Sequence, residues 1–186
     1  MRINTVLKIY MLAVVALLTA CKDDDIPALE YQQQGFVKGT INGVASDNKT
    51  IINKSYEYTQ FAPGLYPNGA AYSYYQVKPD GTINIRVLRQ DIATGGYLSM
   101  GFSLSNDTDT SPDGINYTFQ YTEKSDPYIS FGMESGENDI TITDFSFEKS
   151  SGHLKGKFEI TGSANSTGND ARVTGEIDVV IKEVIQ

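Results

Sequence analysis

The sequence contains no tryptophan, one cysteine and one histidine. With a single thiol the chain cannot form an internal disulfide, so a folded domain must be held together by its hydrophobic core. The usual zinc sites draw on several cysteine and histidine ligands, and this chain cannot supply them. We therefore expect no zinc centre, and nothing else in the sequence calls for a cofactor.

Positive charge is also scarce, with 15 basic against 23 acidic side chains and a formal net charge of −8. An acidic body repels nucleic acid and anionic lipid head groups. We expect no nucleic-acid partner and no electrostatic attachment to a membrane.

The N-terminus carries Arg2 and Lys8, then an almost wholly apolar run over residues 9–20. This run is shorter than the ~20 residues that a membrane-spanning helix needs, and it has the length of a secretory signal. Residues 18–21 (LTAC) resemble a bacterial lipobox. The resemblance implies that residues 1–20 are removed and that Cys21 carries a diacylglyceryl group; the alternative is an incidental cysteine in an ordinary signal peptide.

Cleavage there removes Arg2 and Lys8 but no acidic residue, which changes the net charge from −8 to −10. The membrane contact must then come from acyl chains, of which two or more anchor stably. A cysteine followed by a short acidic run resembles the surface-export signal of Bacteroidota lipoproteins, here Lys22, Asp23, Asp24 and Asp25. The resemblance implies an outer-membrane lipoprotein facing the cell exterior; a periplasm-facing lipoprotein is the alternative. Residues 21–35 then form the lipidated cysteine and a flexible acidic tether.

Residues 36–186 show the alternation of apolar and polar residues that is typical of half-buried antiparallel strands. The clearest runs are 82–89, 97–105, 115–122, 153–161 and 171–184. Residues 78–81 (KPDG) predict a tight hairpin, and the apolar phase slips between Ile142 and Phe145, which predicts a bulge near Asp144. The last three runs (139–148, 153–161 and 171–184) predict a meander.

These features predict a single all-β domain, an antiparallel two-sheet β-sandwich, with a lipocalin-like closed barrel as the alternative. The C-terminal stretch DITITDFSFEKSSGHLKGKFEITG and the opening GFVKGTINGV resemble small Bacteroidota surface lipoproteins of unknown function. The resemblance implies a sandwich-like fold at the cell surface and carries no activity with it.

Catalytic signatures are sparse. His153 stands near Ser150 and Ser151 in a predicted turn, which favours a solvated histidine over a nucleophile and base pair. Asp107, Asp109 and Asp113 alternate in one loop, but the spacing differs from an EF-hand, so a calcium site is the weaker interpretation. A glycoside hydrolase-like carboxylate pair stays open. We expect a non-enzymatic protein.

The segment 56–75 is the least ordinary, because seven of its residues are aromatic. Tyrosines on loops suit both sugar rings and protein partners, and we single out Tyr66, Tyr72 and Tyr74. If Val77 points inward, Tyr72 and Tyr74 point outward; the competing interpretation makes these rings a cover for the core. The sequence thus predicts a surface binder of a glycan or protein ligand, with an assembly component docking on an outer-membrane protein as the alternative.

Overall fold

The computed structural model describes residues 34–60, 73–126, 128–166 and 169–184. Strands dominate these residues, and the single helical element is a short 3-10 turn, η1 (Ala164–Ser166). The described part of the chain holds no helix with the length and apolar character needed to cross a membrane.

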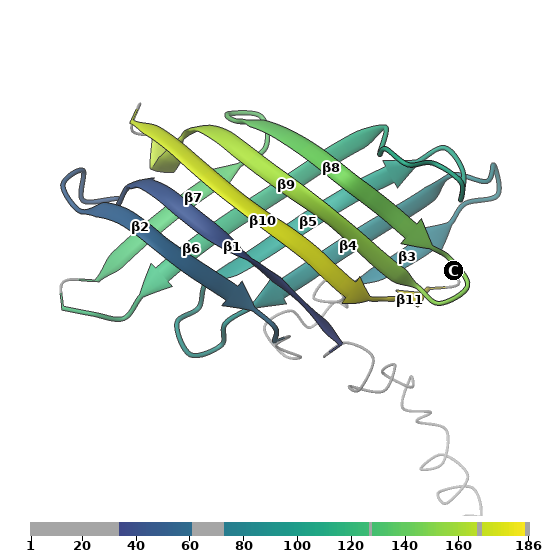
Figure 1. Cartoon of the computed structure of the whole chain (residues 1–186), viewed down its shortest axis with the longest axis horizontal. Helices are drawn as coiled ribbons and strands as arrows, with labels where there is room; N and C mark the ends of the chain where they lie inside the picture. Colours follow the sequence, from purple (N-terminus) through teal and green to yellow (C-terminus); the bar gives the residue numbers. More distant parts are fainter. Residues whose placement is uncertain (1–33, 61–72, 127, 167–168, 185–186) are drawn as a thin grey trace, which may run out of the picture.

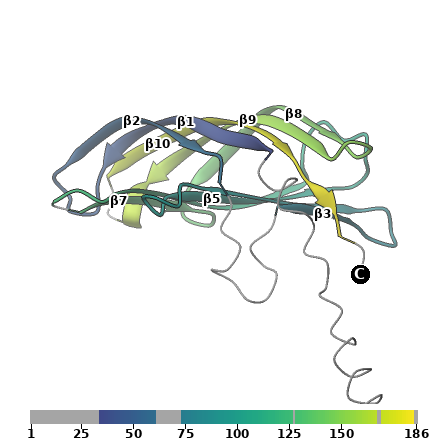
Figure 2. The same cartoon turned by 90° about the horizontal axis from the view of Figure 1, so that it is seen from below.

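The strands form two sheets that pack face to face, and the strands of one sheet cross those of the other (Figures 1 and 2). Sheet A has the order β2 (Ile51–Tyr58), β1 (Gly35–Val44), β10 (Asp170–Val180), β9 (His153–Ser163), β8 (Asp139–Glu148). Sheet B has the order β11 (Lys182–Glu183), β3 (Tyr74–Val77), β4 (Ile83–Gln90), β5 (Tyr97–Leu104), β6 (Gly114–Glu123), β7 (Ile129–Glu134). This arrangement confirms the two-sheet sandwich, and the closed-barrel alternative is wrong.

Local predictions from the sequence are also confirmed. Lys78 and Thr82 close the predicted β3–β4 hairpin, and Gly81 has the positive φ of +89° that such a turn requires. The register of β8 against β9 shifts between Thr143 and Ser146, around Asp144 with φ 52°. The strands β8, β9 and β10 are neighbours in that order, as the predicted meander requires.

Aromatic side chains fill the space between the sheets. The ring of Phe119 lies at centroid distances of 5.0 Å from Tyr56, 6.1 Å from Tyr58 and 6.3 Å from Phe131. All four residues are buried. Two aromatic residues of the unusual 56–75 segment, Tyr56 and Tyr58, are therefore core side chains.

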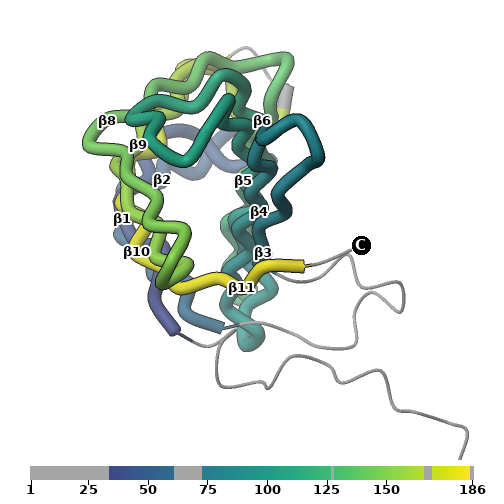
Figure 3. The backbone as a smooth tube through the Cα atoms, turned by 90° about the vertical axis from the view of Figure 1, so that its right-hand side faces the viewer, coloured from purple at the N-terminus to yellow at the C-terminus, as the bar shows by residue number. Residues whose placement is uncertain are grey.

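The sheets are joined at both sides. After β10 the chain passes through Ile181 to β11, which pairs parallel with β3 and so links the last strand of sheet A to sheet B (Figure 3). On the other side, the Nζ of Lys54 on β2 bonds to Glu123 on β6. Lys54 occupies an inward phase of its strand, and it reaches this carboxylate because β2 is an edge strand.

Candidate functional site

The outward-facing side chains of sheet B form a regular grid. Because side chains alternate along each strand, the residues between the core positions point away from sheet A. Cross-strand pairing places them in four rows, which together we call the polar face: Gln76–Asn84–Ser103–Gly114, Tyr74–Arg86–Gly101–Asn116, Leu88–Ser99–Thr118–Glu134 and Gln90–Tyr97–Gln120–Gly132.

Uncharged hydrogen-bonding groups dominate this face. Within the four rows, Arg86 and Glu134 are the charged side chains. The side chains of Gln76, Arg86, Gln90, Ser99, Asn116 and Thr118 take part in no hydrogen bond or ion pair of the described residues. The polar face therefore offers amide, hydroxyl and guanidinium groups whose hydrogen-bonding capacity is available to a ligand.

Two glycines let the amide side chains lie flat on the sheet. A Cβ at Gly101 would stand 2.6 Å from the Oδ1 of Asn116, so that amide covers the glycine on the neighbouring strand. A Cβ at Gly132 would stand 2.9 Å from the Oε1 of Gln120. Gln120 is fixed further, because its Nε2 donates to the Oγ of Ser130 at 2.8 Å. The face is thus a platform of positioned amides.

The surface of this platform contains two shallow hollows. One of about 510 Å³ lies over Asn84, Arg86, Ser99, Gly101, Ser103 and Asn116. A second, of about 340 Å³, is lined by Arg86, Leu88, Gln90, Tyr97, Ser99 and Thr118. The two hollows share Arg86 and Ser99, so Arg86 lies where they meet.

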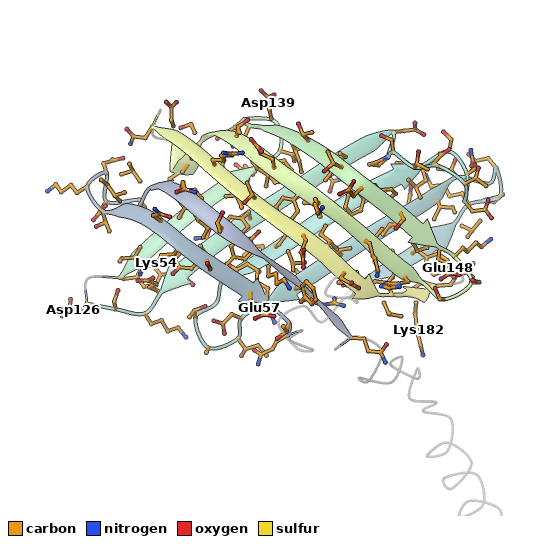
Figure 4. The ribbon with its side chains drawn as sticks, viewed as in Figure 1. Lys54, Glu57, Asp126, Asp139, Glu148 and Lys182 are labelled. Carbon is orange, nitrogen blue, oxygen red and sulfur yellow. The ribbon has the colours of Figure 1, made fainter. Side chains whose placement is uncertain are left out.

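The outward face of sheet A has a different character. There the cations face acidic partners: the Nζ of Lys38 lies 3.0 Å from Glu176, that of Lys157 lies 2.7 Å from Asp144, and Arg172 lies 2.7 Å from Glu159. These pairs are exposed, so each adds little stability and keeps the face hydrated. Figure 4 shows further charges along its border, with Lys54 and Glu57 on β2 and Glu148 at the end of β8.

The edges of sheet A are shielded against pairing with another strand. Along β2 the charged Lys54 and Glu57 are exposed, and β8 carries the bulge at Asp144. Charges and bulges of this kind are what natural edge strands use to block strand addition. Assembly through these edges is therefore disfavoured.

Comparisons of the chain with protein-family models, with curated proteins and with solved structures found no match. We therefore argue function from the geometry of the two sheet faces.

Most of the binding and anchoring residues predicted from the sequence lie outside the described residues, namely Cys21, Lys22, Asp23, Asp24, Asp25, Tyr66 and Tyr72. Tyr74 is described. It lies half-buried on β3 with its ring on the polar face, directly opposite Arg86, whereas Tyr75 points into the core. The outward orientation predicted for Tyr74 is confirmed.

The two residues that flank positions 61–72 are both bound to β4, next to the polar face. The backbone of Gln60 exchanges hydrogen bonds with that of Gln90, at 2.9 and 3.0 Å. The Oγ of Ser73 accepts from the Leu88 amide at 2.8 Å and donates to the Leu88 carbonyl at 3.0 Å.

Arg89 is the least expected side chain of β4, because it points into the interior and is 0% exposed. Its Nη1 donates to Ser73 Oγ at 2.6 Å and to Leu88 O at 2.8 Å, and its Nη2 donates to Gln34 O at 2.8 Å. Its Nε has no partner, and no carboxylate pairs with it among the described residues. Burial lowers the pKa of this guanidinium to about 10. Arg89 fastens the start of the described domain to the residue that precedes β3.

His153 does not act with the neighbouring serines. Its Nε2 lies 2.7 Å from Asp178 Oδ1, while Ser151 Oγ donates to Glu148 at 2.6 Å. Burial raises the pKa of Asp178, but the hydrogen bond with His153 and the charge of Lys155 outweigh it, so the pKa lies below its usual value. The side chain of His153 thus bonds to a surface aspartate and not to a serine.

The acidic loop between β5 and β6 uses its carboxylates to hold itself. Asp109 accepts from the backbone amides of Ser105 at 2.7 Å and Asn106 at 3.1 Å, and Asp113 accepts from the Ser105 hydroxyl. Asp107, in the same loop, lies exposed. The described residues contain no group of three or more histidine, cysteine, aspartate or glutamate side chains placed to hold a metal ion.

Our sequence analysis missed the polar face, including Arg86, Ser99, Asn116 and Thr118. A signal for it exists in the strand pattern. The outward phases of β4, β5 and β6 contain mainly Asn, Gln, Ser and Thr with a single Arg, whereas that of β9 is rich in Lys and Glu and that of β10 carries Asp, Arg and Glu. A comparison of the outward-facing residues of different strands, in addition to their apolar residues, would have identified the polar face from the sequence.

Proposed function

We propose that this chain is a non-enzymatic, lipid-anchored surface lipoprotein that holds an extracellular glycan on the polar face of sheet B. The observation that carries the proposal is the contrast between the two outward faces. Sheet A presents paired charges to water. Sheet B presents mostly uncharged donors and acceptors, and six of these side chains have no hydrogen-bond or ion-pair partner among the described residues.

Sugar hydroxyls both donate and accept hydrogen bonds, and so do amide and hydroxyl side chains. The amides of Asn116 and Gln120 are held over glycines, so little side-chain freedom is lost when a ligand binds. Tyr74 and Tyr97 add aromatic surface with a polar end on either side of Arg86, which suits the apolar faces of sugar rings.

A protein ligand fits this face less well. Protein–protein interfaces have an apolar, often aromatic centre. The exposed large hydrophobic residues of the described chain are Ile51, Ile92, Tyr128 and Val184. Ile92 lines the second hollow, and the other three line neither hollow. A glycan needs no such centre.

The anchor supplies the setting for this function. Acylation of Cys21 and export by residues 22–25 would hold the domain at the outer membrane, facing outward, on a tether whose average reach is roughly 20 Å. Mass spectrometry of the protein from its host tests this part. A lipid-modified Cys21 at the mature N-terminus is expected, and an unmodified thiol would contradict it.

A glycan array probed with the full chain in detergent tests the binding function. The double variant Asn116→Ala, Thr118→Ala should weaken retention of a captured glycan at least tenfold, because it removes two ligand hydrogen bonds. The matched control is Thr141→Ala, Thr174→Ala on the outward face of sheet A, which should bind like the wild type.

Both double variants should keep the wild-type melting temperature, since their changes are on the surface. An array on which the wild type captures no glycan would refute the proposal. So would equal losses in the two variants, because binding would then not depend on the polar face.

A further inference from the structure

Arg86 stands in the middle of the polar face with no anion beside it. Its cross-strand neighbours are Tyr74 on β3 and Gly101 on β5, and Asn116 follows on β6. Along its own strand the outward neighbours are Asn84 and Leu88. No carboxylate occupies these surrounding positions; the one acidic residue in the rows, Glu134, lies on the edge strand β7 in a different row.

This isolation distinguishes Arg86 from the outward cations on the strands of sheet A. The other cations that β1, β9 and β10 present outward all have carboxylate partners: Lys38, Lys155, Lys157 and Arg172. In a chain with 23 acidic and 15 basic residues, carboxylates are abundant enough to neutralise every cation. The net negative charge of the chain repels any polyanion at long range, so the attraction must be local. Around Arg86 the face displays an arginine and excludes acids, which complements a single carboxylate of a ligand because nearby carboxylates would repel it.

Arg86 also has a defined position relative to ligand space. It lines both hollows of the polar face at the place where they meet, together with Ser99. A chain of sugars that crosses from one hollow to the other must pass this guanidinium.

We infer that the glycan held by the polar face is a polyuronate, and that Arg86 binds the carboxylate of a sugar at the junction of the two hollows. This inference rests on the proposed glycan-binding function and specifies its substrate class. A guanidinium presents parallel N–H donors that match the two oxygens of a carboxylate, a geometry that an ammonium group cannot reproduce. The neighbouring hydroxyl of Ser99 and amide of Asn116 bind the neutral hydroxyls of the same chain.

Titration calorimetry of the full chain in detergent tests this with matched ligands. The probes are polygalacturonate, alginate and hyaluronan, each compared with its methyl ester, which removes the charge and keeps the sugar chain. The wild type should bind at least one polyuronate about tenfold or more tightly than its ester, as the loss of a charged hydrogen bond predicts.

Three variants locate the effect. Arg86→Gln should bind the polyuronate and its ester equally, at about the affinity of the wild type for the ester. Arg86→Lys keeps the charge but loses the paired donors, so its preference should be intermediate. Lys38→Gln removes one positive charge from the face of sheet A and serves as the control; it should match the wild type within about twofold.

A wild type that binds esters as tightly as free polyuronates would overturn the inference and leave glycan binding intact. A preference that survives in Arg86→Gln, or that Lys38→Gln abolishes equally, would also overturn it, because the carboxylate would be recognised elsewhere. If no polyuronate binds, the inference fails; if the glycan array is also empty, the proposed function fails with it.

Discussion

Replacing Arg89 by methionine tests whether a buried guanidinium without a counter-ion stabilises this fold. Lowering its pKa from 12.5 to about 10 corresponds to a cost of about 3 kcal/mol for holding the charge in the interior. Methionine has a similar length and carries no charge, so the substitution removes this cost without leaving a large cavity.

The substitution also removes three hydrogen bonds, each with a net value of about 1 kcal/mol. Their acceptors keep other donors: Leu88 N for Ser73 Oγ, Ser73 Oγ for Leu88 O, and Val180 N for Gln34 O. The gain and the loss nearly cancel. We therefore expect Arg89→Met to change the free energy of unfolding at pH 7 by no more than about 1 kcal/mol, or about 2–4 °C in melting temperature.

Measurements at alkaline pH separate the cost of burying the charge from the value of the three hydrogen bonds. Because the folded-state pKa lies below the unfolded value of 12.5, the unfolded state holds more protons between pH 10 and 12.5. This group's contribution to wild-type stability therefore rises over that window, by about 1 kcal/mol at pH 11. Arg89→Met lacks this gain, so the wild type should become the more stable of the two when both are melted at pH 11 and compared with pH 7.

Arg86→Met provides the control, because this half-buried side chain lies on the outward face of the same strand; its stability change should stay within about 0.5 kcal/mol. A loss of more than 3 kcal/mol in Arg89→Met at pH 7 would refute the reasoning, because it would mean that an anion compensates the buried charge.

Two further predictions concern the core and an exposed turn. Phe119→Ala should lower the free energy of unfolding by about 3–5 kcal/mol in denaturant titrations, since the ring is fully buried among three aromatic neighbours; a loss below 1 kcal/mol would show that the core collapses around the gap. The pKa of Asp47 is lowered to about 2, first by the hydroxyl of Thr50 and then by the backbone amides of Thr50 and Lys49. The contribution of Asp47 to stability is present above its usual pKa of 3.8 and is lost as the pH falls towards 2. Asp47→Asn should therefore lose less stability than the wild type between pH 4 and pH 2. An NMR titration that places the pKa of Asp47 near 4 would contradict this.

Sheet architecture could be predicted from the sequence because it depends on local patterns. The alternation in residues 82–89 and 97–105 defines an inward face regardless of which strand is the neighbour. The hairpin at residues 78–81 and the bulge at Asp144 are likewise encoded within a few residues. Strand β2 was harder to recognise, because Lys54 interrupts its inward phase and is accommodated only through contact with Glu123, which is distant in sequence.

Arg89 was unpredictable for a related reason. It follows Ile83, Ile85 and Val87 in the inward phase of β4, and a charge there would ordinarily end the strand or face water. Its acceptors come from Gln34 and Ser73, which lie 55 and 16 residues away along the chain. Such contacts are properties of the folded chain and leave no mark in any local pattern.

The outward surfaces of the two sheets differ in composition. Exposed charges keep a protein soluble, and sheet A carries them in pairs. Unpaired amides and hydroxyls contribute less to solubility, and leaving a lone arginine among them gives up ion pairs that this acidic chain could easily form. A face with these properties adds little to the fold, because its side chains point away from the core. Its hydrogen bonds, such as Ser103 to Asn84 and Gln120 to Ser130, join only adjacent strands of sheet B. Its composition is understandable if a ligand supplies the missing partners.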